Sequence, residues 1–297
     1  MNRSEERPDL SNTLPTLAIT GATGFVGGAV AEHLAADGLP LRLVVRDLSR
    51  APQLERAVAV ETSYADHEAS LKALDGVETL LMISAAENEH RLAEHISFVE
   101  AARDAGVKHI VYTSFVGAAP DSTFTLGRDH YATEQAIIAS GMNYTILRDN
   151  FYADFMPLMA GEDHVLRGPA GDGLAALVTR SDVARVAATV LSDIAAHRNV
   201  TYDLTGPMAL TLSEVASIIS EATGDEYTFY NETIEEAYNS RKRWDAPPWQ
   251  VDAWVSTYTA IANGDMRHVS TDVERITGRP AETLAGFLSR DNPEPQE

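Results

Sequence analysis

A glycine-rich turn at residues 20–28 constrains the fold more than any other stretch of the chain; its sequence is Thr-Gly-Ala-Thr-Gly-Phe-Val-Gly-Gly. The turn follows a short apolar run at 17–20, typical of a buried parallel strand, and helical spacing follows it over 25–36. A strand that enters a helix through closely spaced glycines is typical of a dinucleotide site, because free amides at the helix N-terminus bind phosphates. The alternative is a glycine turn that serves packing alone.

The same alternation of strand and helix continues to about residue 150. Five further strands are predicted, at 41–45, 57–60, 79–83, 109–113 and 143–148. Helical segments between them end at glycines, the residue that best adopts the left-handed cap conformation. We therefore predict an α/β fold, a Rossmann-type doubly wound parallel sheet in the strand order 3-2-1-4-5-6 with helices on both faces.

The end of the second predicted strand bears on the choice of cofactor. An NAD-preferring site usually carries an acidic residue about 20 residues beyond the glycine turn, where it binds the ribose 2′-hydroxyl. Here Val45 is followed by Arg46, whose planar, permanently charged guanidinium suits a 2′-phosphate. Asp47 is adjacent, so NAD is not excluded, and a surface salt bridge is the alternative role for Arg46. The sequence predicts NADP(H) in preference to NAD(H).

After about residue 150 the alternation loosens. Asp182 is the expected cap of a helix at 183–191, a strand is expected at 201–204, and Thr211 or Ser213 is expected to start another helix. We predict three regions: a disordered lead-in at 1–16, an NADP-binding Rossmann domain at 17–150, and a smaller, mostly helical substrate-binding lobe at 151–297. Some strands of this lobe are expected to return to the main sheet.

The composition disfavours several kinds of partner. The formal net charge is −21, so the chain repels the phosphates of nucleic acid and of anionic lipid. No apolar run approaches the ~20 residues needed to cross a bilayer. The lack of cysteine excludes disulfides and thiolate metal sites. We expect a cytoplasmic monomer or homodimer with no metal, no nucleic-acid partner and no membrane partner.

Several further motifs accompany the glycine turn, at residues 44–47, 80–84, 105–110, 130–134 and 144–150. Together they resemble the NmrA-like group of atypical short-chain dehydrogenases, and within it most of all type 2 NAD(P)H:quinone oxidoreductases and triphenylmethane reductases. The resemblance extends from residue 17 to the end of the chain and includes 179–184 and 276–279.

The resemblance implies roles for individual residues. It implies that the pyrophosphate is held by Gly21, Thr23, Gly24, Phe25 and Val26, and the adenosine phosphate by Arg46. It implies that the nicotinamide is surrounded by Ser84, Ala85, Thr113, Asn150, Phe151 and Tyr152. The strand pattern agrees in part, because the ends of the first, fourth, fifth and sixth strands should line the crevice where ligands bind.

One departure from ordinary short-chain dehydrogenases concerns their Tyr-x-x-x-Lys pair, in which the lysine lowers the pKa of the tyrosine. Tyr131 begins a predicted helix where that tyrosine would fall, but Gln135 stands four residues on. Glutamine carries no charge, so it cannot lower the phenol pKa from ~10 by Coulomb attraction. None of the three lysines is expected near this position, and we expect the activated tyrosine to be absent.

The lack of a Tyr-x-x-x-Lys pair constrains which substrate can accept a hydride from the cofactor. Hydride delivery to a plain ketone leaves a strongly basic alkoxide, for which a proton donor matters greatly. Delivery to a quinone leaves a phenolate-like oxygen whose conjugate acid has a pKa near ~10, and delivery to a cationic dye only neutralises a charge. We therefore expect an NADPH-dependent oxidoreductase that reduces an electron-poor conjugated acceptor such as a quinone or a dye.

Three side chains are candidates for catalysis. His130 has the pKa range of a proton or hydrogen-bond donor near neutral pH, with loop orientation as its alternative role. Tyr131 and Tyr152 are candidates to bond or stack on an aromatic substrate, with core packing as the alternative. The Trp-rich segment 244–254 is a candidate lid. Two other functions stay open: a non-catalytic NADP(H)-sensing regulatory protein of the NmrA type, and an epimerase or lyase.

Overall fold

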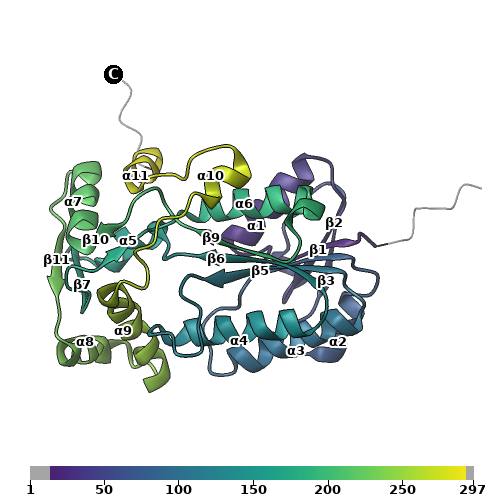
Figure 1. Ribbon diagram of the computed structural model, residues 1–297, viewed down its shortest axis with the longest axis horizontal. Helices are drawn as coiled ribbons and strands as arrows, with labels where there is room; N and C mark the ends of the chain where they lie inside the picture. Colours follow the sequence, from purple (N-terminus) through teal and green to yellow (C-terminus); the bar gives the residue numbers. More distant parts are fainter. Residues whose placement is uncertain (1–13, 292–297) are drawn as a thin grey trace, which may run out of the picture.

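A parallel sheet forms the centre of the larger part of the molecule (Figure 1). The computed structural model describes residues 14–291, and within them this sheet has seven strands: β1 (Leu17–Thr20), β2 (Leu41–Val45), β3 (Ala57–Glu61), β4 (Thr79–Met82), β5 (His109–Phe115), β6 (Asn143–Asp149) and β9 (Val200–Leu204). Their order is β3-β2-β1-β4-β5-β6-β9, and all neighbours are parallel. The predicted Rossmann-type order is confirmed, and β9 from the second half of the chain extends it.

Helices cover both faces of this sheet (Figure 1). One face carries α1 (Phe25–Ala36), α6 (Arg180–Ser192) and α10 (Asp272–Thr277). The other carries α2 (His67–Ala73), α3 (Arg91–Asp104) and α4 (Thr125–Ala139). Because both faces are covered, β2 is buried at all five positions.

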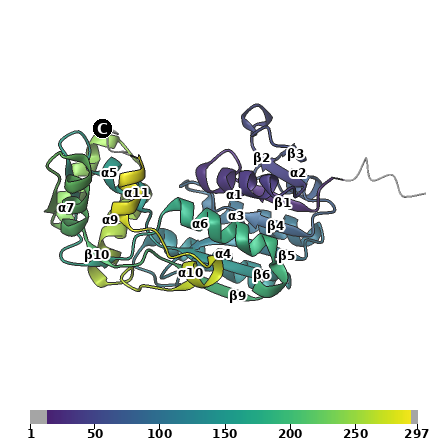
Figure 2. The same cartoon turned by 90° about the horizontal axis from the view of Figure 1, so that it is seen from above.

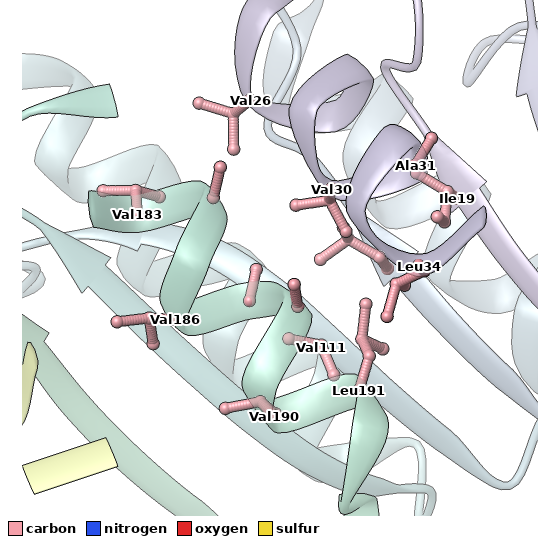
Figure 3. Packing of buried hydrophobic residues seen from close by; sticks show 14 of the residues in the cluster. Ile19, Val26, Val30, Ala31, Leu34, Val111, Val183, Val186, Val190 and Leu191 are labelled. Atoms are coloured by element: carbon pink, nitrogen blue, oxygen red, sulfur yellow. The ribbon is translucent and has the colours of Figure 1, made fainter. Parts of the chain in front are cut away.

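The close packing of α1 on α6 fixes the start of α1 against the sheet. Val26 and Val30 of α1, Val183 and Val186 of α6, and Val111 of β5 are buried together where the two helices pack on the sheet (Figure 3). These side chains belong to one buried cluster that also includes residues of β1, β2 and β9. The second half of the chain therefore helps to hold the glycine turn in place.

The rest of the chain forms a second part at one end of the molecule, away from β1, β2 and β3 (Figure 2). Its helices are α5 (Met156–Met159), α7 (Leu212–Thr223), α8 (Ile234–Arg241), α9 (Pro248–Asn263) and α11 (Leu284–Asp291). Two small sheets accompany them, β7 (Val165–Gly168) with β11 (Thr228–Asn231), and β8 (Leu174–Ala175) with β10 (Leu210–Thr211). Residues after 150 thus contribute both to this part and, through α6, β9 and α10, to the sheet.

Helix starts are where the structure departs most from the sequence expectations. The predicted cap Asp182 is wrong: α6 begins at Arg180, and the Thr179 side chain accepts the amide of Asp182, which lies in the first turn. Thr211 does cap α7, with Glu214 completing a capping box. α4 begins at Thr125 rather than near 132, without any side-chain cap to mark its start.

Two expectations concern the ends of the chain and the membrane. Most of the predicted disordered lead-in, residues 1–13, lies outside the described residues. Thr16 leads into β1, and its carbonyl accepts the amides of Glu78 and Thr79. Between residues 14 and 291, no helix has the length and apolar character required to span a membrane.

Candidate functional site

The glycine turn connects β1 to α1 where the strand order reverses, between β1 and β4. Gly21 has a φ of +66°, in the left-handed region, and its carbonyl accepts the amide of Gly24 at 2.9 Å. A Cβ on Gly27 would lie 2.4 Å from the Gly21 oxygen, so only glycine lets the helix pack directly on the turn. A Cβ on Gly24 would meet only the Gly21 oxygen, at 3.4 Å, and would otherwise project into open space.

The amides at this turn are available to a ligand. Gly24 is the N-cap of α1 and supplies no side-chain cap, and the first turn of the helix holds no acidic residue. Within residues 14–291 no hydrogen bond uses the amides of Thr23, Phe25 or Val26. Exposed amides at the positive end of a helix dipole bind anions. The five turn residues predicted from the sequence thus lie together at the start of α1, where unpaired amides are available to an anion. That they bind a diphosphate stays a prediction.

Arg46 and Asp47 lie beside this cradle and differ in what they already bind. β2 pairs with β1, so Arg46 leaves the sheet next to the turn. Arg46 is exposed and makes no ion pair within the described residues. Asp47 Oδ1 instead accepts both the amide and the hydroxyl of Ser49, at 2.9 and 2.6 Å, and these bonds lower the pKa of Asp47. The Arg46 guanidinium is therefore available to a phosphate, whereas the Asp47 carboxylate caps a short local turn.

The loop after β4 is fixed by side chains from β5 and α3. The amide of Ser84 donates to Thr113 Oγ1 at 2.8 Å. The amide of Ala85 donates to His95 Nε2 at 2.9 Å, and its carbonyl accepts Arg91 Nε at 3.0 Å. The structure thus brings together Ser84, Ala85 and Thr113, which the resemblance groups around the nicotinamide, and adds His95 and Arg91, which the sequence analysis missed.

Beneath that loop lies a buried polar layer between β5, α3 and α4. Arg91 Nη2 lies 3.0 Å from His130 Nε2, and the Tyr112 hydroxyl lies 3.0 Å from His130 Nδ1. Because a guanidinium only donates, His130 Nε2 accepts and Nδ1 carries the proton. Likewise His95 Nε2 accepts from Ala85, so Nδ1 donates to Thr133 Oγ1 at 3.1 Å. Both histidines are therefore neutral in this layer.

The pKa values of the two histidines agree with their hydrogen bonds. Burial, together with the Arg91 charge, lowers the pKa of His95 to about 3. Burial, Arg91 and His95 lower the pKa of His130 well below its usual value. The His130 residue is 6% exposed and faces Arg91 and Tyr112, so the structure places it in the layer that supports the site rather than at its surface.

The other candidates on α4 differ in exposure. Tyr131 is half-buried and makes no side-chain hydrogen bond within residues 14–291, and Gln135, one turn on, is exposed. Glu134 is buried, accepts the Ser114 hydroxyl at 2.6 Å and binds Arg148 through both carboxylate oxygens. Ser114 thus bonds to a carboxylate and not to Tyr131.

The segment after β6 carries the last group of predicted residues. Asn150 donates to the Met266 carbonyl at 2.9 Å and accepts the amide of Phe151 at 2.7 Å, which holds this segment against the second part of the molecule. The hydroxyl oxygen of Tyr152 lies within hydrogen-bond distance of Asp149 Oδ2, at 2.6 Å. Asp149 is a further residue that the sequence analysis missed, since one acidic side chain at the end of a strand gives no signal by itself.

Residues after 150 make contacts at both the glycine turn and the loop after β4. The Arg180 guanidinium, held by Asp154, lies 4.4 Å from the centroid of the Phe25 ring at the glycine turn. Gln250 and Trp254 of α9 each donate to Glu87 Oε2 at 3.1 Å, in the loop after β4. The Trp-rich segment therefore contacts the loop after β4, and its role as a lid stays a prediction. No group of three His, Asp or Glu side chains suited to hold a metal ion occurs within residues 14–291.

We expect His95→Leu to destabilise the protein by about 3 kcal/mol near neutral pH, because the Ala85 amide and the Thr133 hydroxyl would lose a buried partner. Urea unfolding measures the change, with the exposed His33→Leu as the matched control. In the wild type the unfolded chain takes up the proton of His95 below about pH 6.5 while the folded protein does not, so stability falls with pH. The difference in unfolding free energy between the wild type and His95→Leu should therefore shrink by about 2 kcal/mol between about pH 6.5 and 5. A difference that does not change with pH would contradict the assignment of His95 as neutral in the folded protein.

Comparisons with known proteins agree with this geometry. A family model described as NAD(P)H-binding matches residues 21–194. Quinone oxidoreductase 2 of Escherichia coli strain K12 is 34% identical over 280 residues, which cover 92% of this chain and 97% of that protein.

Two solved structures extend the comparison to the fold. The NADPH-dependent quinone oxidoreductase of Escherichia coli, complexed with NADPH, has a TM-score of 0.85 at 32% identity and covers 93% of this chain and 99% of its own. The triphenylmethane reductase of Citrobacter sp. has a TM-score of 0.81 at 33% identity and covers 93% and 98%. The resemblance inferred from the motifs is confirmed.

Proposed function

The chain belongs to the NAD(P)H-binding family, and from this premise we propose that it is an NADPH-dependent reductase of quinones, dyes and related electron-poor conjugated acceptors. The observation that carries the proposal is the cradle of unpaired amides at the turn between β1 and α1. The names of its relatives, a quinone oxidoreductase and a triphenylmethane reductase, support the choice of acceptor.

The cofactor site follows from the residues at the carboxyl edge of the sheet. The backbone of Gly21, Thr23, Gly24, Phe25 and Val26 would bind the diphosphate, and Arg46 the 2′-phosphate. The commitment of Asp47 to Ser49 supports NADPH over NADH, because the carboxylate that would favour a free ribose hydroxyl already caps a turn. Ser84, Ala85, Thr113, Asn150 and Phe151 would surround the nicotinamide. When bound, the cofactor supplies a hydride.

The residues around the proposed site also bear on the choice of acceptor. Gln135 gives Tyr131 no cationic neighbour that would activate its hydroxyl, which supports an acceptor whose reduced oxygen needs little help from an acid. The neutral, buried His130 acts through Arg91, as a positioning residue for the Ser84–Ala85 loop. Tyr152 stays our candidate for direct contact with the substrate, and Tyr131 is a candidate for packing against it.

A panel of acceptors tests the proposal. We expect the purified protein to oxidise NADPH in the presence of a simple benzoquinone, a naphthoquinone or a triphenylmethane dye. A plain ketone should react at least about 100-fold more slowly, because general-acid assistance of that order is what it needs and the Tyr/Lys pair is missing. Absorbance of NADPH gives the rates.

The alternatives predict different outcomes in the same experiment. Cofactor binding with no turnover across the panel would overturn the reductase proposal and support an NADP(H)-sensing regulatory role. A preference for the plain ketone would contradict the argument from Gln135. We further propose that the protein acts in the cytoplasm as a monomer or homodimer on small molecules; gel filtration distinguishes the two assemblies.

A further inference from the structure

Asp149 is a buried carboxyl group at the carboxyl end of β6, on the edge of the sheet that carries the proposed nicotinamide site. It is 3% exposed. Its neighbours in the sheet are apolar, Phe115 of β5 and Leu204 of β9. Its Oδ2 contacts the Tyr152 hydroxyl at 2.6 Å, while its Oδ1 is buried and has no hydrogen-bond partner within the described residues.

No cation compensates this carboxyl group. Between residues 14 and 291 no Lys, Arg or His forms an ion pair with Asp149. The charged groups that face the pair are Asp154, from the segment after β6, and Arg180 of α6, and these two bind each other at 2.8 Å. A buried carboxylate without a counter-ion is expensive, and the group takes up a proton instead. In agreement, burial raises the pKa of Asp149 to about 8.

The position of that proton follows from the hydrogen bonds available. On Oδ1 the proton would have no acceptor, and a buried donor without a partner is costly. On Oδ2 it faces the Tyr152 oxygen at 2.6 Å, which accepts it. The protonated acid then donates to Tyr152, and the O–H of the tyrosine turns away from Asp149. When Asp149 is ionised, Tyr152 must donate to the carboxylate instead.

We propose that protonated Asp149 is a positioning residue. Its O–H donates a hydrogen bond to the Tyr152 oxygen, which leaves the tyrosine O–H to donate a hydrogen bond to the oxygen of the substrate that is reduced. Ionisation of Asp149 withdraws this donor. The arrangement supplies a hydrogen bond to the developing phenolate without the lysine that ordinary short-chain dehydrogenases use. The inference rests on the proposed reductase function and on the placement of Tyr152 beside the substrate.

The pH dependence of turnover tests the inference. With a benzoquinone as acceptor, we expect kcat of the wild type to fall about tenfold between pH 7 and 9, as Asp149 ionises near pH 8. Asp149→Asn should retain the rate at pH 7 and lose the fall, because an amide N–H donates to Tyr152 at every pH. The kcat of Tyr152→Phe should be low and independent of pH. Tyr144→Phe, at the other end of β6, is the matched control for the loss of a tyrosine hydroxyl. An unchanged alkaline fall in Asp149→Asn would overturn the inference.

A second measurement needs neither cofactor nor turnover, so its failure is distinct from failure of the proposed function. The folded pKa of Asp149 lies above its unfolded value, so the wild type loses stability as pH rises from about 4 to 8. Asp149→Asn carries no such penalty. Its melting temperature relative to the wild type should therefore rise across this range and level off above it. A difference independent of pH would show that Asp149 ionises normally and would overturn the inference even if quinone turnover is observed.

Discussion

Gly24→Val is expected to abolish NADPH binding, raising the dissociation constant at least about 100-fold, while the protein stays folded. In the free protein a Cβ at this position meets only the Gly21 oxygen, at an ordinary contact distance of 3.4 Å. The valine side chain would instead occupy the space over the amides of the turn, where the diphosphate must approach the backbone closely. The loss of these charge-assisted hydrogen bonds accounts for the expected size of the effect.

Two measurements separate a blocked site from a damaged fold. Titration with NADPH gives the dissociation constant, and thermal unfolding without cofactor gives the stability. Ala36→Val adds the same kind of apolar bulk at the exposed far end of α1 and should change neither quantity substantially. Normal NADPH binding by a folded Gly24→Val protein would show that the turn does not hold the diphosphate.

Arg46→Ala is expected to weaken NADPH binding about 100-fold and NADH binding less than about threefold. A guanidinium bound to a phosphate through charge-assisted hydrogen bonds contributes about 3 kcal/mol, and NADH has no 2′-phosphate to lose that contact. Arg46 is exposed, without an ion pair in the described part of the chain, so its removal leaves no buried charge behind. Titrations with the two dinucleotides measure the ratio.

An arginine away from the crevice controls for the change in net charge. Arg103, near the end of α3, is exposed and paired with Asp104, and Arg103→Ala should alter the binding of both dinucleotides equally and only slightly. Equal, large weakening of both by Arg46→Ala would mean that the 2′-phosphate lies elsewhere, and Arg50 on the following short turn would then be the next arginine to test.

Much of the fold could be predicted because its signals are local. The apolar runs of β1 and β2 and the glycines between β1 and α1 depend on residues close in sequence. The start of α4 at Thr125 was missed, since no side chain caps it. β9 was expected as a strand, but its place beside β6 depends on a connection of about fifty residues that passes through the second part of the molecule.

By itself, the sequence determined the glycine-rich strand–turn–helix proposed to bind a diphosphate, the arginine after the second strand and the glutamine four residues after Tyr131, because these depend on residue identity and short-range geometry. Only the tertiary structure decided the states of His95, His130 and Asp149. Their protonation depends on burial and on partners such as Arg91 and Tyr112, which come from separate elements and meet only when the sheet and its helices have assembled. Charge in a protein interior follows from what surrounds a group in space, and that information is not local in the chain.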